Sequence, residues 1–190
     1  MILLEGHSDT RARWSGNFTT FSDAERLETE PPYVEVMLKA DGEQLELRLR
    51  QYIRGRGYDD WLSVATSPKG SYREEDVLNF LDRHLPAWGP GRGWRLMLAD
   101  AFAAHDTENV KRLAWSRGYV FMLIGGGATS VAQTCDTDLN QHVRREYTAL
   151  EGKELVALCA AGQTVPKVSY ETTLDMMAAV MSHRELHRAA

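Results

Sequence analysis

Trp94-Arg-Leu-Met-Leu-Ala-Asp100 and Tyr119-Val-Phe-Met-Leu-Ile124 are the two apolar runs that decide the fold of this chain. Near-continuous apolar runs of this length are typical of parallel strands that are buried on both faces. Between them, Thr107 can cap a helix and Gly118 can end it. The sequence therefore predicts a β-α-β unit, with two neighbouring parallel strands, in an α/β protein. The helix residues expected to face inward are Val110, Leu113, Ala114 and Trp115.

Strand and helix patterns also alternate before Trp94. Strands are predicted at residues 14–21, 33–40 and 61–65. Ser71 and Glu74 form a capping box, which predicts a helix that opens there and runs to Leu85. The segment 43–53 is ambiguous, because its apolar residues fit helical spacing while Gln44-Leu-Glu-Leu-Arg-Leu-Arg50 also alternates as a strand does.

The residues after Ile124 are expected to be mainly helical. Helices are predicted over residues 136–150, 151–161 and 170–186. Met176, Met177 and Met181 have helical spacing and are expected to belong to a core or to a surface for a partner helix. We therefore expect a main domain over residues 1–162 and a C-terminal helical extension over residues 163–190.

Length and charge limit the classes of protein to which the chain can belong. With 190 residues, 43% of them hydrophobic, it is long enough for one sizeable core. The formal net charge of −5 argues against strong nucleic-acid binding by this chain alone, because such binding normally needs a basic surface. The acidic composition weakens a role on DNA without excluding it.

The cysteines and the apolar segments indicate in which cellular compartment the protein is expected. Cys135 and Cys159 lack the number and spacing of a disulfide framework or a zinc site, so we expect buried free thiols. Met1-Ile-Leu-Leu4 is too short for a signal peptide, and no apolar run approaches the roughly 20 residues of a membrane span. An intracellular protein outside the membrane is expected.

Asp100 and Asp136 are the candidate metal ligands. Each follows one of the two predicted strands, so the fold can bring both acids to one edge of a sheet. Carboxylate oxygens suit Mg²⁺, and paired divalent ions promote phosphodiester chemistry. Asp136 could instead cap the helix that follows it, a role for which Asp138 competes. His105 could support the Asp100 carboxylate or orient a phosphate, or it could be a solvated residue at a helix entry.

Three segments resemble a known family. Leu98-Ala-Asp100-Ala-Phe-Ala-Ala-His105 resembles the LLDNAPSH segment of the DDE-superfamily endonucleases, the catalytic domains of pogo- and mariner-type transposases. Ala128-Thr-Ser-Val-Ala-Gln133-Thr-Cys-Asp136 is similar to their TTSLLQPLD segment, and Met37-Leu-Lys-Ala-Asp41-Gly42 to the end of their SADG strand. Ala101 and Ala103 depart from the family pattern, which has Asn and Pro there.

The resemblance implies a catalytic triad of acids that binds two Mg²⁺ or Mn²⁺ ions. Asp100 matches the second acid and Asp136 the third, and Gln133 precedes the third acid as in the family. Asp9 is the best-placed candidate for the first acid, with Glu5 as the alternative. A further alternative is that the first strand lies upstream of this sequence, which would leave the triad incomplete.

The resemblance also implies a fold and an activity. The fold would be an RNase H-like mixed sheet flanked by helices on both faces, with extra C-terminal helices. The activity would be metal-dependent cleavage and transfer of DNA strands, by a homodimer in the nucleus if the source is eukaryotic. Two alternatives are a catalytically inactive, domesticated transposase domain that serves as a DNA- or protein-interaction scaffold, and an unrelated α/β domain.

Overall fold

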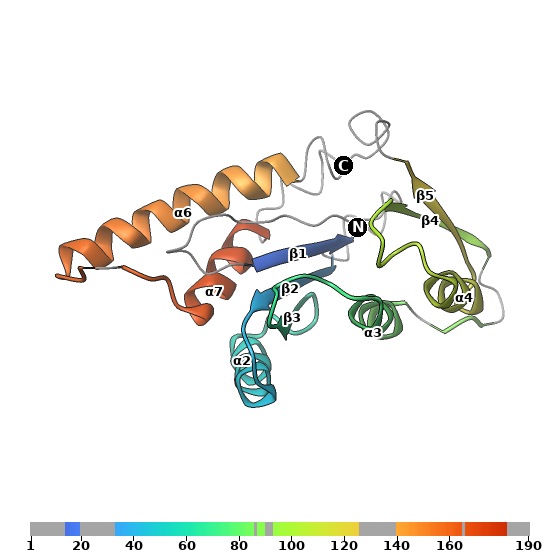
Figure 1. Ribbon diagram of the computed structural model, residues 1–190, viewed down its shortest axis with the longest axis horizontal. Helices are drawn as coiled ribbons and strands as arrows, with labels where there is room; N and C mark the ends of the chain where they lie inside the picture. The colour runs from blue at the N-terminus through green and yellow to red at the C-terminus, as the bar shows by residue number, and fades with distance from the viewer. Residues whose placement is uncertain are drawn as a thin grey trace.

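The computed structural model describes residues 14–19, 33–85, 87–89, 93–125, 140–164 and 166–181. These residues confirm the predicted α/β class, with strands and helices that alternate along much of the chain (Figure 1). In chain order the elements are β1 (Trp14–Thr19), β2 (Tyr33–Lys39), α2 (Glu43–Arg56), β3 (Leu62–Ser67), α3 (Glu74–His84), β4 (Arg95–Asp100), α4 (Glu108–Ser116), β5 (Tyr119–Ile124), α6 (Asn140–Ala160) and α7 (Tyr170–Met181).

β2 is the middle strand of a three-stranded mixed sheet. β1 runs antiparallel to β2, and β3 runs parallel to it after the crossover through α2. Successive side chains of a strand point to opposite faces. Val34, Val36 and Leu38 accordingly pack in one core, whereas Glu35 and Met37 lie on the face that α3 covers. The segment 43–53, which the sequence left open, is helical.

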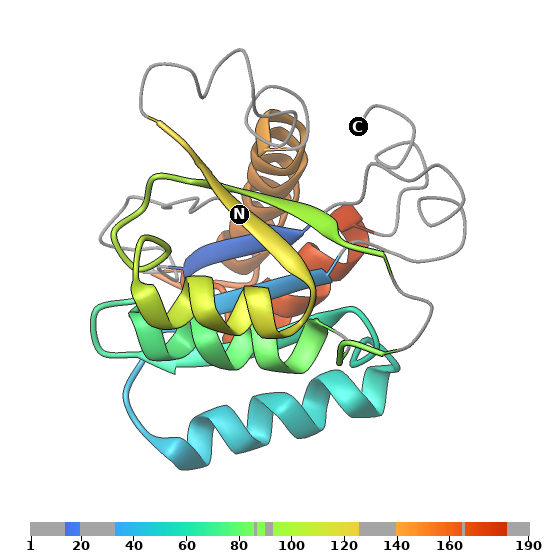
Figure 2. The ribbon, with the colours of Figure 1, turned by 90° about the vertical axis from the view of Figure 1, so that its right-hand side faces the viewer.

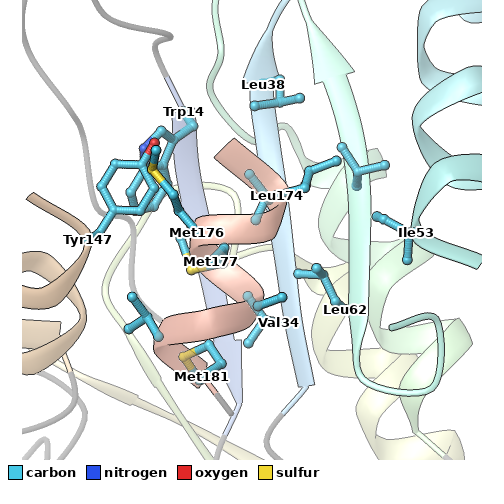
Figure 3. Close-up of a cluster of buried hydrophobic side chains, with 14 of the residues drawn as sticks. Trp14, Val34, Leu38, Ile53, Leu62, Tyr147, Leu174, Met176, Met177 and Met181 are labelled. Atoms are coloured by element: carbon cyan, nitrogen blue, oxygen red, sulfur yellow. The ribbon is translucent and has the colours of Figure 1, made fainter. Parts of the chain in front are cut away.

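The first core lies between this sheet and the helices α2, α6 and α7 (Figure 3). Leu174, Met177 and Met181 of α7 are buried over β1 and β2, so these methionines belong to a core as expected. Tyr147 of α6 packs edge-on against Trp14, with 4.9 Å between the ring centroids. Although α7 follows the predicted boundary at residue 162, it packs in the same core as β2, and the division of the chain there stays a prediction.

The second core lies on the opposite face of the three-stranded sheet. Val77, Phe80 and Leu81 of α3 pack there with Met37 of β2. α4 lies beside α3 and adds Val110, and β4 and β5 run above these two helices (Figure 2). Helices thus cover both faces of the central sheet, so that each apolar face of the sheet is buried.

β4 and β5 are neighbouring parallel strands, as the sequence predicted. Within the described residues they form a two-stranded sheet of their own, separate from β1, β2 and β3. The prediction of one mixed sheet is therefore wrong for the described residues, in which β4 and β5 pair with each other and not with β1, β2 or β3. The RNase H-like arrangement stays a prediction.

The ends of α4 agree with the sequence, but the predicted start of α3 is wrong. Thr107 caps α4 by accepting a hydrogen bond from the Val110 backbone amide at 3.3 Å. α3 begins at Glu74 and not at the predicted capping residue Ser71. The Ser71 amide instead donates to the Ser67 hydroxyl at 3.2 Å, so Ser71 belongs to the turn after β3.

Two further expectations about helices are wrong. Residues 140–160 form one continuous helix, although the sequence predicted a break after residue 150. A single glycine inside a helix costs only about 1 kcal/mol relative to alanine, so Gly152 does not end α6. Trp115, expected to face inward, is 60% exposed and packs against Trp94, with ring centroids 4.5 Å apart.

Glu35 is a buried acid in the middle of β2. Its carboxylate accepts hydrogen bonds from Arg83 at 3.0 Å and from the Ser63 hydroxyl at 3.1 Å. Tyr72 donates to the Glu35 backbone oxygen at 2.7 Å. Desolvation by burial raises the pKa of Glu35, and the opposing effects of Arg83 and Ser63 only reduce that rise.

The raised pKa of Glu35 predicts a pH-dependent contribution to stability. The folded state holds the proton of this carboxyl more tightly than the unfolded state, whose carboxyl titrates near 4.5. Relative to a Glu35→Gln variant, the wild type should be most stable below pH 4.5 and lose stability as the pH rises through the folded pKa. Urea unfolding of both proteins across this range tests the effect, and a constant difference between them would contradict it.

Gly118 is predicted to be intolerant of alanine for two reasons. Its φ of +80° is unfavourable for other residues, and a Cβ there would overlap the six-membered ring of Trp88. Gly57 is the matched control, because it has a φ of +72° and open space where a Cβ would stand. We expect Gly57→Ala to lower the free energy of unfolding by about 1 kcal/mol, and Gly118→Ala by about 2–4 kcal/mol. Equal losses in urea unfolding would mean that Trp88 does not pack on Gly118.

Candidate functional site

The candidate site is built around Asp100, the last residue of β4. In the register of the two-stranded sheet, Asp100 lies beside Ile124, the last residue of β5. Both strands therefore end at the same edge of the sheet, which is the arrangement predicted from the sequence for a site at two strand ends. Because β4 is paired along its length, the backbone that carries Asp100 is fixed, and its carboxylate stands at a defined position.

His105 is the immediate partner of the Asp100 carboxylate. Its Nδ1 lies 2.5 Å from Oδ1 of Asp100 and 3.3 Å from the backbone oxygen of the same residue, which accepts a hydrogen bond when Nδ1 carries the proton. The imidazole is only 2% exposed, whereas the Asp100 side chain is 20% exposed. Of the roles considered from the sequence, the structure excludes a solvated histidine at the helix entry.

A tight turn after β4 brings His105 back to Asp100. The His105 backbone amide donates to the Phe102 oxygen at 2.8 Å, and the two rings pack edge to face with centroids 5.3 Å apart. The turn leads directly to Thr107, which caps α4. The strand end, the turn and the helix cap therefore hold the imidazole in one place, so that it fixes the orientation of the carboxylate.

This arrangement is suited to a ligand carboxylate with a supporting histidine. Metal ligands in proteins are commonly oriented by neighbouring groups that hydrogen-bond to them. The partial exposure of Asp100 allows the carboxylate to meet an ion from solvent, while buried His105 restricts its rotation. One carboxylate holds a divalent hard cation only weakly, and further oxygen ligands would be needed for two ions.

The other predicted site residues lie outside the described part of the chain. These residues are Asp9, Gln133, Asp136 and Asp138. Their distances to Asp100 therefore stay predictions. Among the described residues, no three His, Cys, Asp or Glu side chains come together as a group that could hold a metal ion.

Two other acids are placed by the structure. Asp41 follows β2 and is exposed before α2. Glu35, which no motif in the sequence singled out, is buried. Its carboxylate accepts hydrogen bonds from Arg83 and Ser63, which indicates a structural role. A single charged residue inside the apolar strand Val34-Glu-Val-Met-Leu38 is the signal that could have singled out Glu35.

Comparison with protein-family models, with curated proteins and with solved structures finds no match for the chain.

Two further expectations from the sequence concern the cysteines and a membrane-spanning segment. Cys159 is exposed, so the expectation of a buried thiol is wrong for this residue; Cys135 lies outside the described residues. No helix in the described ranges has both the length and the apolar character needed to cross a membrane.

The Asp100–His105 pair is predicted to be energetically coupled. Because His105 is buried and its Nδ1 lies 2.5 Å from the carboxylate, we expect a coupling of about 1–3 kcal/mol in a double-mutant cycle of alanine variants. The exposed pair Arg54–Asp59, at 3.6 Å, is the control and should couple by less than about 0.5 kcal/mol. Urea unfolding measures both cycles. A coupling no larger than that of the control pair would show that His105 does not fix the carboxylate.

Proposed function

We propose that this chain is the metal-dependent DNA-cleaving and strand-transfer domain of a DDE transposase, or the remnant of one, in which Asp100 is a ligand of Mg²⁺ or Mn²⁺. The observation that carries this proposal is the placement of Asp100. Its carboxylate stands at a strand end, is oriented by a buried histidine, and remains partly open to solvent. The similarity of Leu98–His105 and Ala128–Asp136 to the family segments supports the same assignment.

The chemistry of phosphodiester cleavage explains why carboxylates are needed. Two divalent ions roughly 3.5–4 Å apart stabilise the attacking and the leaving oxygen together. Hard cations of this kind prefer carboxylate oxygens. In the proposed site Asp136 joins Asp100, and Asp9 is the candidate for the first acid that a complete triad would need. His105 acts through Asp100, since it holds the carboxylate in the orientation that an ion would meet.

The proposed substrate is DNA, and the proposed assembly is a homodimer. A net charge of −5 gives the chain little electrostatic attraction for phosphates, so binding would depend on a separate basic module. A nuclear location in a eukaryotic source belongs to the same proposal.

A second candidate function is an inactive scaffold derived from such a domain. The observation that favours it is the burial of His105 against Asp100, because a buried pair of this kind can serve as a structural contact. In that case the pair would stabilise the turn before α4 and would have no affinity for an ion. Metal binding therefore distinguishes the two candidates.

Mn²⁺ binding tests the role of Asp100. We expect the wild type to bind Mn²⁺ with a dissociation constant on the order of millimolar, because few carboxylates share the ion. Asp100→Asn keeps the shape of the side chain and an acceptor for His105 but removes the charge, so binding should be lost. The control is Asp60→Asn, at an exposed aspartate just before β3, which should bind as the wild type does. Electron paramagnetic resonance of free Mn²⁺ reports the binding of all three proteins.

Cleavage of supercoiled plasmid completes the experiment. We expect little or no metal-dependent cleavage by these 190 residues alone, because a third acid is normally needed to fix two ions against their mutual repulsion. Strong cleavage that Asp100→Asn abolishes would show that the triad is complete within this chain. Equal Mn²⁺ binding by the wild type and Asp100→Asn would exclude Asp100 as a ligand and leave the scaffold as the better candidate.

A further inference from the structure

The outer face of the two-stranded sheet is apolar and exposed. It consists of Leu96 and Leu98 on β4 and of Val120 and Met122 on β5, which lie opposite one another in the register of the sheet. The four side chains are between 40% and 55% exposed. The alternate positions, including Met97 and Phe121, face inward and pack on the second core. One side of this sheet is therefore covered and the other is open to water.

Three exposed tryptophans form a cluster next to this outer face, at the amino-terminal end of β4. Trp94 directly precedes the strand and contacts Trp88 and Trp115, with ring centroids 4.7 Å and 4.5 Å away. The three indoles are 42–60% exposed. The seven side chains leave roughly 700 Å² of apolar surface in water, more than the ~300–600 Å² of the largest patch on a typical monomer.

Leaving such a face in water is unfavourable for this type of sheet. Parallel strands occur almost only in sheets that are covered on both faces, because their side chains are apolar on both sides. Here α4 covers the inner face, and within the described residues no helix covers the outer one. The size and composition of the face are therefore those of a surface that is buried in an assembly.

We propose that a second copy of this chain covers this outer face, in a two-fold dimer that packs the two-stranded sheets of both copies face to face. The exposed area is close to the ~800 Å² per partner of a standard stable interface. The four central side chains carry no charge, so the face offers nothing to attract a phosphate backbone or a charged peptide. It is complementary to an identical aliphatic face.

The composition of the face fits a two-fold arrangement. In an isologous interface the same patch is used by both partners, and sheets that pack face to face lie about 10 Å apart. The aliphatic residues of β4 and β5 would form the buried centre together with Trp94 beside them, since large aromatic anchors contribute most to binding when they are fully desolvated. Asp100 ends the strand beyond this patch, so the candidate metal site would lie at the edge of the interface.

This inference rests on the homodimer of the proposed function but needs neither metal nor DNA. Sedimentation velocity in the absence of both therefore tests it separately from the Mn²⁺ experiment. The wild type should be a dimer at micromolar concentration. Leu96→Lys places a charge within this apolar face in each copy and should raise the dissociation constant at least tenfold. Val156→Lys is the matched control, because Val156 is an apolar residue of α6 that is 70% exposed and lies outside this face.

Met122→Lys, on the neighbouring strand, is a second variant in case Leu96→Lys does not fold. Circular dichroism should show that both variants keep the secondary structure of the wild type and unfold cooperatively, since both positions are about half exposed. A wild type that stays monomeric at high concentration would overturn the proposal and assign the face to a different partner. A Val156→Lys protein that dissociates as readily as Leu96→Lys would also overturn it, as would unfolding of both face variants.

Discussion

The burial of β2 on both faces is the constraint on which the rest of the structure depends. Val34, Val36, Met37 and Leu38 are fully buried, and Glu35 between them is nearly so. Complete burial of an aliphatic side chain contributes about 1.5–3 kcal/mol, so each face of the strand must be covered. α2 and α7 cover one face and α3 covers the other, so the layers of the molecule follow from this one strand.

The same constraint explains the polar network of Glu35. A carboxylate in the middle of a buried strand must be hydrogen-bonded, because an isolated buried charge is very unfavourable. Arg83 from α3 and Ser63 from β3 donate hydrogen bonds to this carboxylate. Both elements are therefore held against β2 at the position of Glu35. The position of α3 is thus determined by polar contacts as well as by Phe80 and Leu81 of the second core.

Local signals in the sequence predicted the β4-α4-β5 unit well, and the long-range arrangement poorly. The β4-α4-β5 unit and its Thr107 cap involve residues close together in the chain, and the structure confirms them. The apolar run of β4 indicated burial on both faces, but a pattern does not specify what covers a face, and the outer one is open. For the same reason the helical spacing of Trp115 could not reveal that this residue packs on Trp94 at the surface.

The candidate site follows the same division between local and long-range information. Asp100 and His105 are five residues apart and are brought together by one turn, which the sequence can indicate. A metal centre with further acids depends on segments far apart in the chain, whose placement no local pattern determines. β4 carries both this site and the exposed apolar face. A partner bound to that face would shield one side of the strand, and the edge where β4 and β5 end would remain the direction from which an ion or a phosphate could approach Asp100.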